Sequence, residues 1–291
     1  MQLKSTMEKL KIAVQKSGRL QEKTVALLKE CGLSFSNGPN RLKTDARNFP
    51  AEILYLRDDD IPQYVQDAVA DIGIVGENVF IEKNKSIKLI ERLDFAKCRL
   101  SIAVPKSTEY TDTAFLEGKR IATSYPFIVT KFLQEKNINA EIHEISGSVE
   151  IAPGIGLADA ICDIVSTGST LLSNGLQEVE TVMKSEAVLV AGQQLSTSKQ
   201  EILDKLIFRI KAVNTAKNNK YLLLNTPNDA IEAITKVLPG MKSPTVTPLN
   251  EEGWSSLHSV VNEDDFWNKI DQLKSLGAQG ILVIPIEKMI L

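Results

Sequence analysis

The segment from Asp163 to Leu171 contains the residue types that suggest chemistry most directly. It has the sequence Asp-Ile-Val-Ser-Thr-Gly-Ser-Thr-Leu and follows an apolar run that predicts a buried strand. Where such a strand turns into a helix, several backbone N–H groups lack partners and favour a phosphate dianion. Gly168 allows a close approach to the backbone, and the hydroxyls of Thr167, Ser169 and Thr170 can donate further hydrogen bonds. We therefore predict a loop that holds the phosphate of a phosphorylated ribose.

The first residue of this segment, Asp163, stands at the end of the predicted strand, where its carboxylate can accept hydrogen bonds from ribose hydroxyls. An ordinary helix N-cap also explains the hydroxyl residues, because Ser and Thr begin helices in proteins of every function. A lone Thr-Gly-Ser-Thr favours that second interpretation. The phosphate interpretation therefore needs support from other parts of the chain.

Other catalytic residue types are scarce. The two histidines, His143 and His258, lie in alternating runs that predict strands, which argues against a histidine-assisted nucleophile. The three cysteines, Cys31, Cys98 and Cys162, are far apart and lack a Cys-x-x-Cys spacing. This pattern predicts neither a disulfide framework nor a zinc site, and it fits a reducing, cytoplasmic compartment.

The composition places the chain among ordinary globular proteins. Its 291 residues are 43% hydrophobic and 24% charged, which suits about two domains with a real core. The 34 basic and 37 acidic side chains give a net charge of −3, so nucleic acid is not an expected partner. No apolar run approaches the ~18 residues of a membrane helix, and the first residues contain no signal-peptide core.

Short apolar runs alternate with helical patterns and predict βαβ units around mainly parallel sheets. Predicted strands cover 11–14, 52–56, 71–75, 99–104, 120–123, 141–145 and 161–165. Predicted helices cover 20–31, 61–70, 126–136, 156–160 and 199–215. Pro105 marks a crossover into a second lobe, and a strand over 181–190 returns to the first. The expected fold class is α/β, with a two-lobed body like that of periplasmic binding proteins.

The C-terminal part has a different pattern. Predicted strands over 220–225, 243–249, 255–261 and 280–284 and helices over 227–237 and 264–276 follow the order βαββαβ. This order is the ferredoxin-like split unit, and it predicts a separate domain over 220–291. Lobe I is expected to consist of 1–103 and 186–219, and lobe II, with the phosphate loop, of 104–185.

Residues 150–171 also carry a recognisable pattern. The stretch resembles, position for position, the signature of the ATP phosphoribosyltransferase family. The signature residues are Glu150, Gly156, Ala158, Ile161, Asp163, Ile164, Thr167, Gly168, Thr170 and Leu171. Co-linear segments similar to that family occur at 15–20, 57–62, 71–78, 93–95, 98–100, 120–126 and 284–289. The ferredoxin-like tail resembles the long form of the family, which carries its own regulatory domain.

This resemblance implies an activity. The family transfers the phosphoribosyl group of phosphoribosyl pyrophosphate to N1 of ATP and releases pyrophosphate, as the first step of L-histidine biosynthesis. Displacement at an anomeric carbon through an oxocarbenium-like transition state depends on positioning and electrostatic stabilisation. The resemblance also implies Mg²⁺, which we expect the substrate phosphates to carry for the most part because this ion retains waters and phosphate ligands.

The resemblance also assigns site residues. It implies that Arg19, Arg41 and Asp163 are catalytic, with both arginines on the triphosphate or pyrophosphate, where a planar fork is well suited. The substrate-binding residues that it implies are Lys16, Ser17, Gly18, Arg57, Glu150, Thr167, Gly168, Ser169 and Thr170. The acids Asp58 and Asp59 after Arg57 suit a solvated helix start or the cleft, and a metal-binding cluster is less favoured.

The tail of the family binds histidine as a feedback inhibitor between regulatory domains of neighbouring subunits, and the family forms dimers and hexamers. The matching positions here are Asn225, Met241, Thr245, Val260 and Gly280. This chain has Asn225 where a carboxylate can occur and Gly280 where alanine or serine is common. For Met241 and Val260, an ordinary core or turn role is an equal alternative.

Two other functions compete with this one. A solute-binding receptor would share the two-lobed body. Against a receptor, the N-terminus lacks a signal-peptide core, and a receptor would not explain the phosphate loop or the regulatory-type tail. A phosphoribosyltransferase of nucleotide salvage typically has paired acids directly before its Thr-Gly loop. Here Ile161 and Cys162 precede Asp163, so the second acid is missing from the strand.

Overall fold

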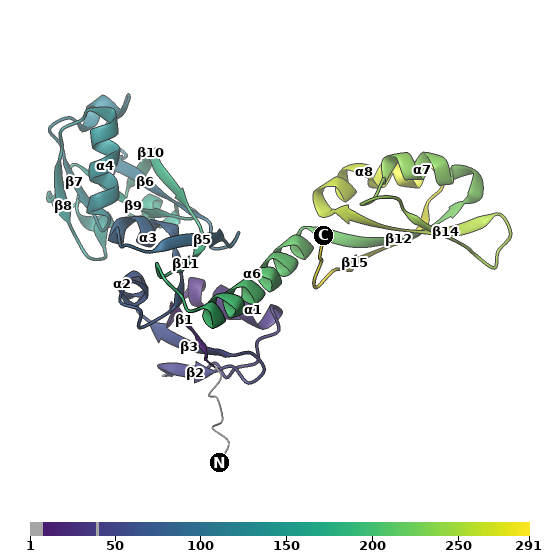
Figure 1. Ribbon diagram of the computed structural model, residues 1–291. Helices are drawn as coiled ribbons and strands as arrows, with labels where there is room; N and C mark the ends of the chain where they lie inside the picture. The colour runs from purple at the N-terminus through teal and green to yellow at the C-terminus, as the bar shows by residue number, and fades with distance from the viewer. Residues whose placement is uncertain (1–7, 39–40) are drawn as a thin grey trace, which may run out of the picture. The chain divides into compact units, whose positions relative to one another are not determined.

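The computed structural model describes residues 8–38 and 41–291 (Figure 1). The chain forms two compact units, one ending at Leu203 and the other beginning at Asp204. The first unit contains two sheets and the second contains one.

The first sheet of the first unit has the strand order β2-β3-β1-β4-β11-β5. Its strands are β1 (Leu10–Gln15), β2 (Lys43–Asp45), β3 (Ala51–Leu56), β4 (Ile72–Gly76), β5 (Lys88–Arg92) and β11 (Ala187–Ala191). Strand β1 pairs in parallel with β3 and β4, whereas β11 is antiparallel to β4 and β5. The sheet is therefore mixed rather than mainly parallel, because β11 enters it from the second sheet in the opposite direction.

The second sheet has the order β10-β6-β9-β7-β8. Its strands are β6 (Cys98–Pro105), β7 (Arg120–Thr123), β8 (Glu141–Glu144), β9 (Ala160–Val165) and β10 (Leu176–Ser185). The helices of this unit are α1 (Arg19–Glu30), α2 (Ile61–Gln66), α3 (Glu77–Lys83), α4 (Pro126–Lys136) and α5 (Ser169–Ser173), with 3₁₀ turns η1 (Asp58–Asp60), η2 (Thr113–Leu116) and η3 (Val149–Ile151).

Apolar periodicity explains how these elements pack. Four of the six residues of β1 are buried, as expected for a strand that is covered on both faces. Helix α1 buries Val25, Leu27 and Leu28 and leaves charged residues outside. Gly73 on β4 fits under α2, since a Cβ there would come within 2.5 Å of the Ile61 side chain.

Three sequence predictions differ from the structure. The single strand expected over 181–190 is broken at Glu186 into β10 and β11, which lie in different sheets. The backbone N–H of Glu77 donates to the carbonyl of Glu186 at this break. Instead of a helix over 156–160, turns lead into β9, and Gly156 has a left-handed φ of 74°. Strand β6 belongs to the second sheet, so the crossover precedes Cys98 rather than following at Pro105.

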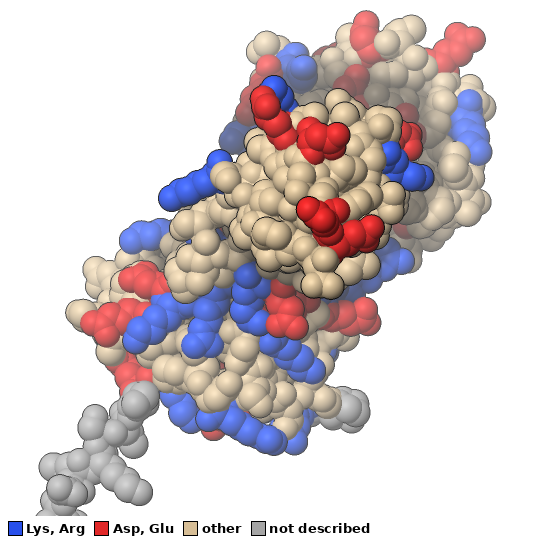
Figure 2. All heavy atoms as spheres, turned by 90° about the vertical axis from the view of Figure 1, so that its right-hand side faces the viewer, with Lys and Arg blue, Asp and Glu red and all other residues tan. Residues whose placement is uncertain are grey.

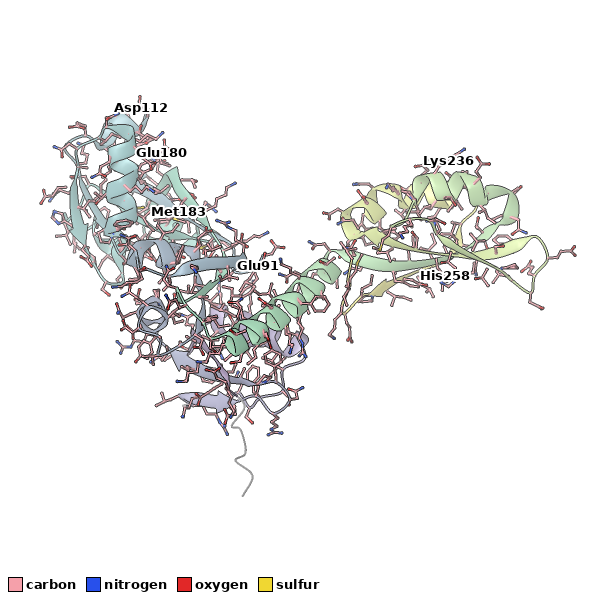
Figure 3. The ribbon with its side chains drawn as sticks, in the orientation of Figure 1. Glu91, Asp112, Glu180, Met183, Lys236 and His258 are labelled. Atoms are coloured by element: carbon pink, nitrogen blue, oxygen red, sulfur yellow. The ribbon has the colours of Figure 1, made fainter. Side chains whose placement is uncertain are left out.

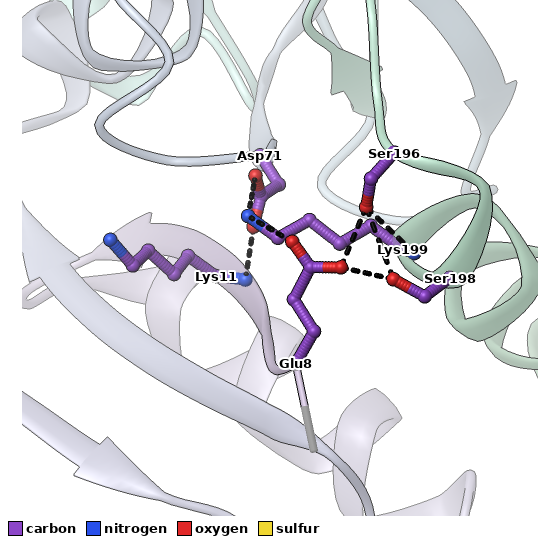
Figure 4. A network of polar contacts seen from close by, with 6 residues as sticks. All are labelled: Glu8, Lys11, Asp71, Ser196, Ser198 and Lys199. Carbon is purple, nitrogen blue, oxygen red and sulfur yellow. Dashed lines mark hydrogen bonds and ion pairs between the residues drawn. The ribbon is translucent and has the colours of Figure 1, made fainter. Parts of the chain in front are cut away.

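A network of polar contacts joins the start of helix α6 (Thr197–Lys217) to the first sheet (Figure 4). The Asp71 side chain is only 6% exposed, and it accepts the Lys11 backbone N–H at 2.8 Å. Its other oxygen lies 2.8 Å from Nζ of Lys199. The Lys199 ammonium is the partner that compensates the buried carboxylate, since a charge taken out of water must be paired.

Replacing Lys199 with Met is therefore expected to destabilise the first unit by about 3 kcal/mol, because Asp71 would stay buried without its counter-charge. Urea unfolding at neutral pH measures this loss. Lys205→Met, an exposed position on the same helix, is the control and should change stability little. Adding Asp71→Asn to Lys199→Met should restore part of the loss, and a double variant as unstable as Lys199→Met would refute the explanation.

The second unit is a four-stranded antiparallel sheet in the order β13-β14-β12-β15. Its elements are β12 (Asn219–Pro227), η4 (Asn228–Ala230), α7 (Ile231–Val237), β13 (Thr245–Pro248), β14 (Trp254–Asn262), α8 (Glu263–Ser275) and β15 (Gln279–Pro285). The sequence prediction of a βαββαβ order is confirmed. Leu222, Leu224 and Leu257 form the core with residues of α7 and α8, so one face of the sheet is covered by the helices.

Candidate active site

The segment after β9 forms the loop that the sequence predicted. Gly168, with a φ of 81°, precedes α5 in the left-handed region, which a side chain would disfavour. Among the backbone hydrogen bonds of the described residues, none uses the amides from Ser166 to Thr170 as donors. The hydroxyls of Thr167 and Ser169 lie 3.1 Å apart. The loop therefore offers unpaired N–H groups and hydroxyls together, a combination that suits an anion.

These groups line a cavity of about 150 Å³. Its wall contains Asp163 and the residues from Ile164 to Leu171, together with Glu150 from η3 and Arg19 from the start of α1. Arg19 and Glu150 are far from the loop in sequence, so the fold brings together three predicted parts of the site. A cation, two carboxylates and a set of N–H donors thus surround one small space.

The negative charges of Asp163 and Glu150 interact in this cavity. Burial raises the pKa of Asp163, and the negative charge of Glu150 raises it further, while the Ile164 N–H, which donates to Asp163 Oδ1 at 2.8 Å, lowers it. The sequence lacked a second acid directly before the loop. The structure supplies that acid from η3, at the Glu150 position that the family signature contains.

The remaining turn residues line a different and larger cavity of about 820 Å³. Its wall contains Lys16, Ser17 and Gly18 from the turn after β1, and Arg41. Tyr55 also lines it, and burial raises the pKa of this phenol while the charge of Arg41 opposes the rise. Arg19 and Arg41 therefore lie at different cavities, although the sequence analysis assigned them to the same phosphate chain.

The charge of the surface is uneven in a way that the net charge does not reveal. On the face drawn in Figure 2, Lys and Arg side chains gather in the lower part of the view. Figure 1 draws β1, β2 and β3 at this height, together with α1 and the start of α6. A local excess of positive charge on this face favours an anionic ligand there, despite the net charge of −3.

Arg57 lies outside the residues that line these two cavities, exposed at the start of η1. The next residue, Asp58, has a buried Oδ1 without a hydrogen-bond partner in the described part of the chain. Burial raises the pKa of Asp58 to about 6, the neighbouring Asp59 adds to the rise, and Lys83 opposes it. Asp59 itself is exposed and lies 3.1 Å from Nζ of Lys83. Asp59 therefore fits the solvated helix start that the sequence suggested for both acids, whereas Asp58, with its buried Oδ1, does not.

Asp58→Asn is expected to stabilise the protein above pH 6 by about 2 kcal/mol, because an amide avoids burying a charge. The folded state holds the Asp58 proton more tightly than the unfolded chain, whose aspartates have a pKa of about 3.9. Stability of the parent protein therefore falls as the pH rises from about 4 to 6, and the advantage of the variant disappears near pH 4.

Urea unfolding at several pH values between 4 and 8 measures this difference. Glu135→Gln, at an exposed position on α4, is the matched control and should give no pH-dependent gain. A gain from Asp58→Asn that is equally large at pH 4 would show that the carboxylate is not the cause.

The structure adds a set of contacts between α3 and the start of α4 that sequence analysis left without a role. The amide of Asn78 donates to the Tyr125 hydroxyl at 3.1 Å. The two oxygens of Glu82 accept the backbone N–H groups of Phe127 and Ile128 at 2.9 and 3.0 Å. Burial and the nearby charge of Asp163 raise the pKa of Tyr125. Asn78 and Tyr125 lie in segments noted for their family resemblance, whereas Glu82, Phe127 and Ile128 lie outside those segments.

In the second unit, the strand register places Asn225, Thr245 and Val260 on one face of the sheet, opposite the helices. Val260 pairs with Tyr221, and Thr245 pairs with His258. Figure 3 labels His258 on this sheet; its ring nitrogens lie 3.0 Å from the Tyr221 hydroxyl and 3.1 Å from the Ser256 hydroxyl. The open sheet face is therefore polar as well as apolar.

The other two predicted residues of this unit are Gly280 and Met241. Gly280 lies beside Asn225, since a Cβ built on it would come within 3.4 Å of Asn225 Nδ2. Its φ of 57° also favours glycine. Met241, between α7 and β13, is 54% exposed. The two departures from the family pattern, Asn225 and Gly280, are therefore neighbours in space.

Comparison with known proteins gives a consistent result. A family model described as ATP phosphoribosyltransferase matches residues 57–212, and a model of the C-terminal domain of HisG matches residues 216–288. The chain belongs to the ATP phosphoribosyltransferase family. Because the C-terminal domain is present, it is a long-form member.

Curated relatives of this family cover almost the whole chain. The ATP phosphoribosyltransferase of Cytophaga hutchinsonii is 62% identical over 281 residues, which span 97% of this chain and 98% of that protein. The corresponding enzyme of Bacteroides thetaiotaomicron is 58% identical and covers 97% and 99% of the two chains. The family catalyses the first step of histidine biosynthesis, and the sequence prediction of the enzyme class is confirmed.

Solved structures support the fold. The ATP phosphoribosyl transferase (HisG:HisZ) complex from Thermotoga maritima matches with a TM-score of 0.59 and 30% identity, over 69% of this chain and 98% of that chain. The arginine-bound protein Tv2483 matches with a TM-score of 0.51 and 13% identity over 72% and 86% of the chains, which indicates a shared fold alone.

Within residues 8–38 and 41–291, no helix combines the length and apolarity that crossing a bilayer requires. The described residues also contain no group of three or more His, Cys, Asp and Glu side chains arranged to hold a metal ion. Near the phosphate loop, the carboxylates of Glu150 and Asp163 are the oxygen donors of the kind that Mg²⁺ prefers.

Proposed function

We propose that this chain transfers the phosphoribosyl group of phosphoribosyl pyrophosphate to N1 of ATP, with release of pyrophosphate. The observation that carries the proposal is the small cavity in which the loop amides and hydroxyls meet Arg19, Glu150 and Asp163. In this proposal the residues from Thr167 to Thr170 bind the 5′-phosphate. The carboxylates of Asp163 and Glu150 accept hydrogen bonds from the ribose hydroxyls.

The second substrate occupies the larger cavity in this proposal. Lys16 and Arg41 neutralise the ATP triphosphate there, and Ser17 and Gly18 contact it through the turn after β1. Arg57, which does not line either cavity, is proposed to contact the substrate from the exposed start of η1. Because the two cavities are separate, the smaller one can bind the sugar phosphate while the larger one binds the triphosphate.

The reaction then follows from position and charge. Adenine N1 forms a bond to the anomeric carbon while the bond from that carbon to pyrophosphate breaks, and the electron pair leaves with pyrophosphate. The carboxylates stabilise the positive charge that develops on the ribose, and the Arg19 guanidinium stabilises the charge on the leaving group. No covalent enzyme intermediate is needed, so this chemistry depends on positioning and charge rather than on a nucleophilic side chain.

Mg²⁺ is expected to be carried mainly by the substrate phosphates, with Asp163 and Glu150 as the adjacent carboxylates. When bound, the ion neutralises part of the charge of the leaving pyrophosphate. In this proposal Arg19 shares that task from the protein side.

The second unit is proposed to bind L-histidine and thereby inhibit the enzyme. Asn225, Thr245 and Val260 on the open sheet face, with Gly280 and Met241, are the proposed contacts. A face that is not covered by helices within one chain also suits association of several copies, and we propose dimers and hexamers. The substrates are metabolites of the cytoplasm, which is the compartment that we propose.

An assay of the purified protein tests the proposal. With ATP, phosphoribosyl pyrophosphate and Mg²⁺, we expect phosphoribosyl-ATP to form, and we expect chelation of the metal or millimolar histidine to suppress it. A sizing run with and without histidine measures the oligomer. Binding of both substrates without formation of phosphoribosyl-ATP would contradict the proposed roles of Arg19, Asp163 and Glu150 in the reaction.

A further inference from the structure

Behind the phosphate loop lies an ion pair that does not line either cavity. Arg99 is on β6, which lies in the second sheet between β9 and the edge strand β10. Its Nε and Nη2 donate to the two carboxylate oxygens of Glu178 on β10, with Nη2 and Oε2 2.5 Å apart. The pair is half-buried, with side-chain exposures of 35% and 25%. Such a bidentate contact fixes the plane of the guanidinium.

The third nitrogen of this guanidinium reaches the loop. Nη1 of Arg99 donates to the carbonyl oxygen of Ser166 at 3.3 Å, and Ser166 is the first residue after β9. Within the described part of the chain, the other hydrogen bonds of residues 166–168 go to the adjacent helix α5, from the Leu172 N–H to the Gly168 carbonyl and between the Thr167 and Ser169 hydroxyls. The backbone that presents the unpaired amides is therefore held at its start by a single side chain.

The strand register explains why Arg99 can do this. Arg99 pairs with Val165, the last residue of β9, and also with Lys184 on β10. Its Nη1 reaches the Ser166 carbonyl, one residue beyond the end of β9, while Glu178 on β10 accepts from its Nε and Nη2. Loss of Arg99 would leave the Ser166 carbonyl without its donor, and loss of Glu178 would leave the guanidinium without its fixed orientation. Either change would allow the loop more conformations and lower its affinity for a phosphate.

We propose that Arg99, oriented by Glu178, is a positioning residue that holds the phosphate loop in the conformation that binds the sugar phosphate. Because neither residue lines the cavity, the pair acts on the ligand through the backbone of Ser166. The inference depends on the proposed function in one respect, since it takes the ligand of the loop to be a ribose phosphate.

The same sheet provides a matched control. Arg120 on β7 donates from Nε and Nη2 to the two oxygens of Asp159, and from Nη1 to the carbonyl of Gly156 at 3.0 Å. The side chains of this pair are 39% and 36% exposed. It has the same fork, the same kind of carbonyl contact and similar exposure, but it holds the turn before β9 instead of the phosphate loop.

Calorimetric titration with ribose 5-phosphate and, separately, with ATP tests the inference on the full-length protein. We expect Arg99→Met to weaken ribose 5-phosphate binding on the order of tenfold, as other residues that orient a direct ligand contact do, and to leave ATP binding within about twofold. Arg99→Lys, which keeps the charge but not the fork, should bind with intermediate affinity.

Arg120→Met should leave the affinity for ribose 5-phosphate close to that of the parent. Equal losses from Arg99→Met and Arg120→Met, or an equal loss for both ligands, would overturn the inference, and melting curves of each variant identify a general loss of folding. Glu178→Gln provides a second, milder test, because it removes the charge but keeps an acceptor.

The outcome is separable from that of the proposed reaction. If the parent protein binds ribose 5-phosphate and Arg99→Met weakens it, the inference holds even where no phosphoribosyl-ATP is formed. If the parent protein does not bind ribose 5-phosphate or phosphoribosyl pyrophosphate, the loop does not hold a sugar phosphate and the inference is wrong.

Discussion

Simultaneous replacement of Thr167 and Ser169 by Ala is expected to weaken phosphoribosyl pyrophosphate about 100-fold while ATP binding changes less than about twofold. Each hydroxyl can donate to a charged phosphate oxygen, and such bonds contribute roughly 1.5–3 kcal/mol. The two hydroxyls are 3.1 Å apart and line the same small cavity, so they act on one ligand group. Their effects should not add fully, because neighbouring contacts are coupled.

Binding constants for the two substrates, measured separately, test this expectation. Thr130→Ala is the control, since that hydroxyl at the start of α4 donates to the Pro126 carbonyl at 2.7 Å and does not line the cavity. It should leave both affinities unchanged. If the double variant weakened ATP as much as phosphoribosyl pyrophosphate, the loop would not be the sugar-phosphate site.

The local parts of this site could be predicted from the sequence. Gly168 between hydroxyl residues, after an apolar strand, predicts an anion-binding turn because each of those features depends only on neighbours in the chain. The ferredoxin-like order of the second unit was predictable for the same reason, since apolar alternation and turn residues define each element.

The parts that depend on tertiary structure could not be predicted in this way. Residues 181–190 have one continuous strand pattern, but β10 and β11 belong to different sheets, and periodicity carries no information about which sheet a strand joins. Glu150 and Arg19 reach the cavity from η3 and α1, and only the family resemblance suggested a role for them. Arg99 was part of a matching segment, yet its contact with Ser166 depends on strand register.

The separation of the two arginines leads to a sharper expectation than sequence alone allowed. Arg19 lines the cavity of the phosphate loop, whereas Arg41 lines the larger cavity with Lys16. If the leaving pyrophosphate lies between the loop and α1, Arg19 is the protein cation that can stabilise the charge that develops on it. Interactions that strengthen in the transition state act on kcat, and those that bind substrate equally in both states act on KM.

Arg19→Met is therefore expected to lower kcat by about 100- to 1,000-fold, the range found when one preorganised donor to a developing negative charge is removed. Arg41→Met should act mainly by raising the KM for ATP. Arg19→Lys should recover only part of the activity, because an ammonium keeps the charge but lacks the planar fork. Steady-state kinetics with each substrate varied in turn measure these effects.

The control for Arg19→Met is Arg47→Met, which removes an exposed arginine from the same unit whose contact is with the Ser36 hydroxyl at 3.5 Å. Arg47→Met makes the same change in charge and side-chain size as Arg19→Met. A loss of activity in Arg47→Met would therefore indicate an effect of the protein's overall electrostatic field. A loss of kcat confined to Arg19→Met supports a direct role for Arg19. A change in the ATP KM alone would instead move Arg19 to the triphosphate site and leave the loop carboxylates and Mg²⁺ to stabilise the leaving group.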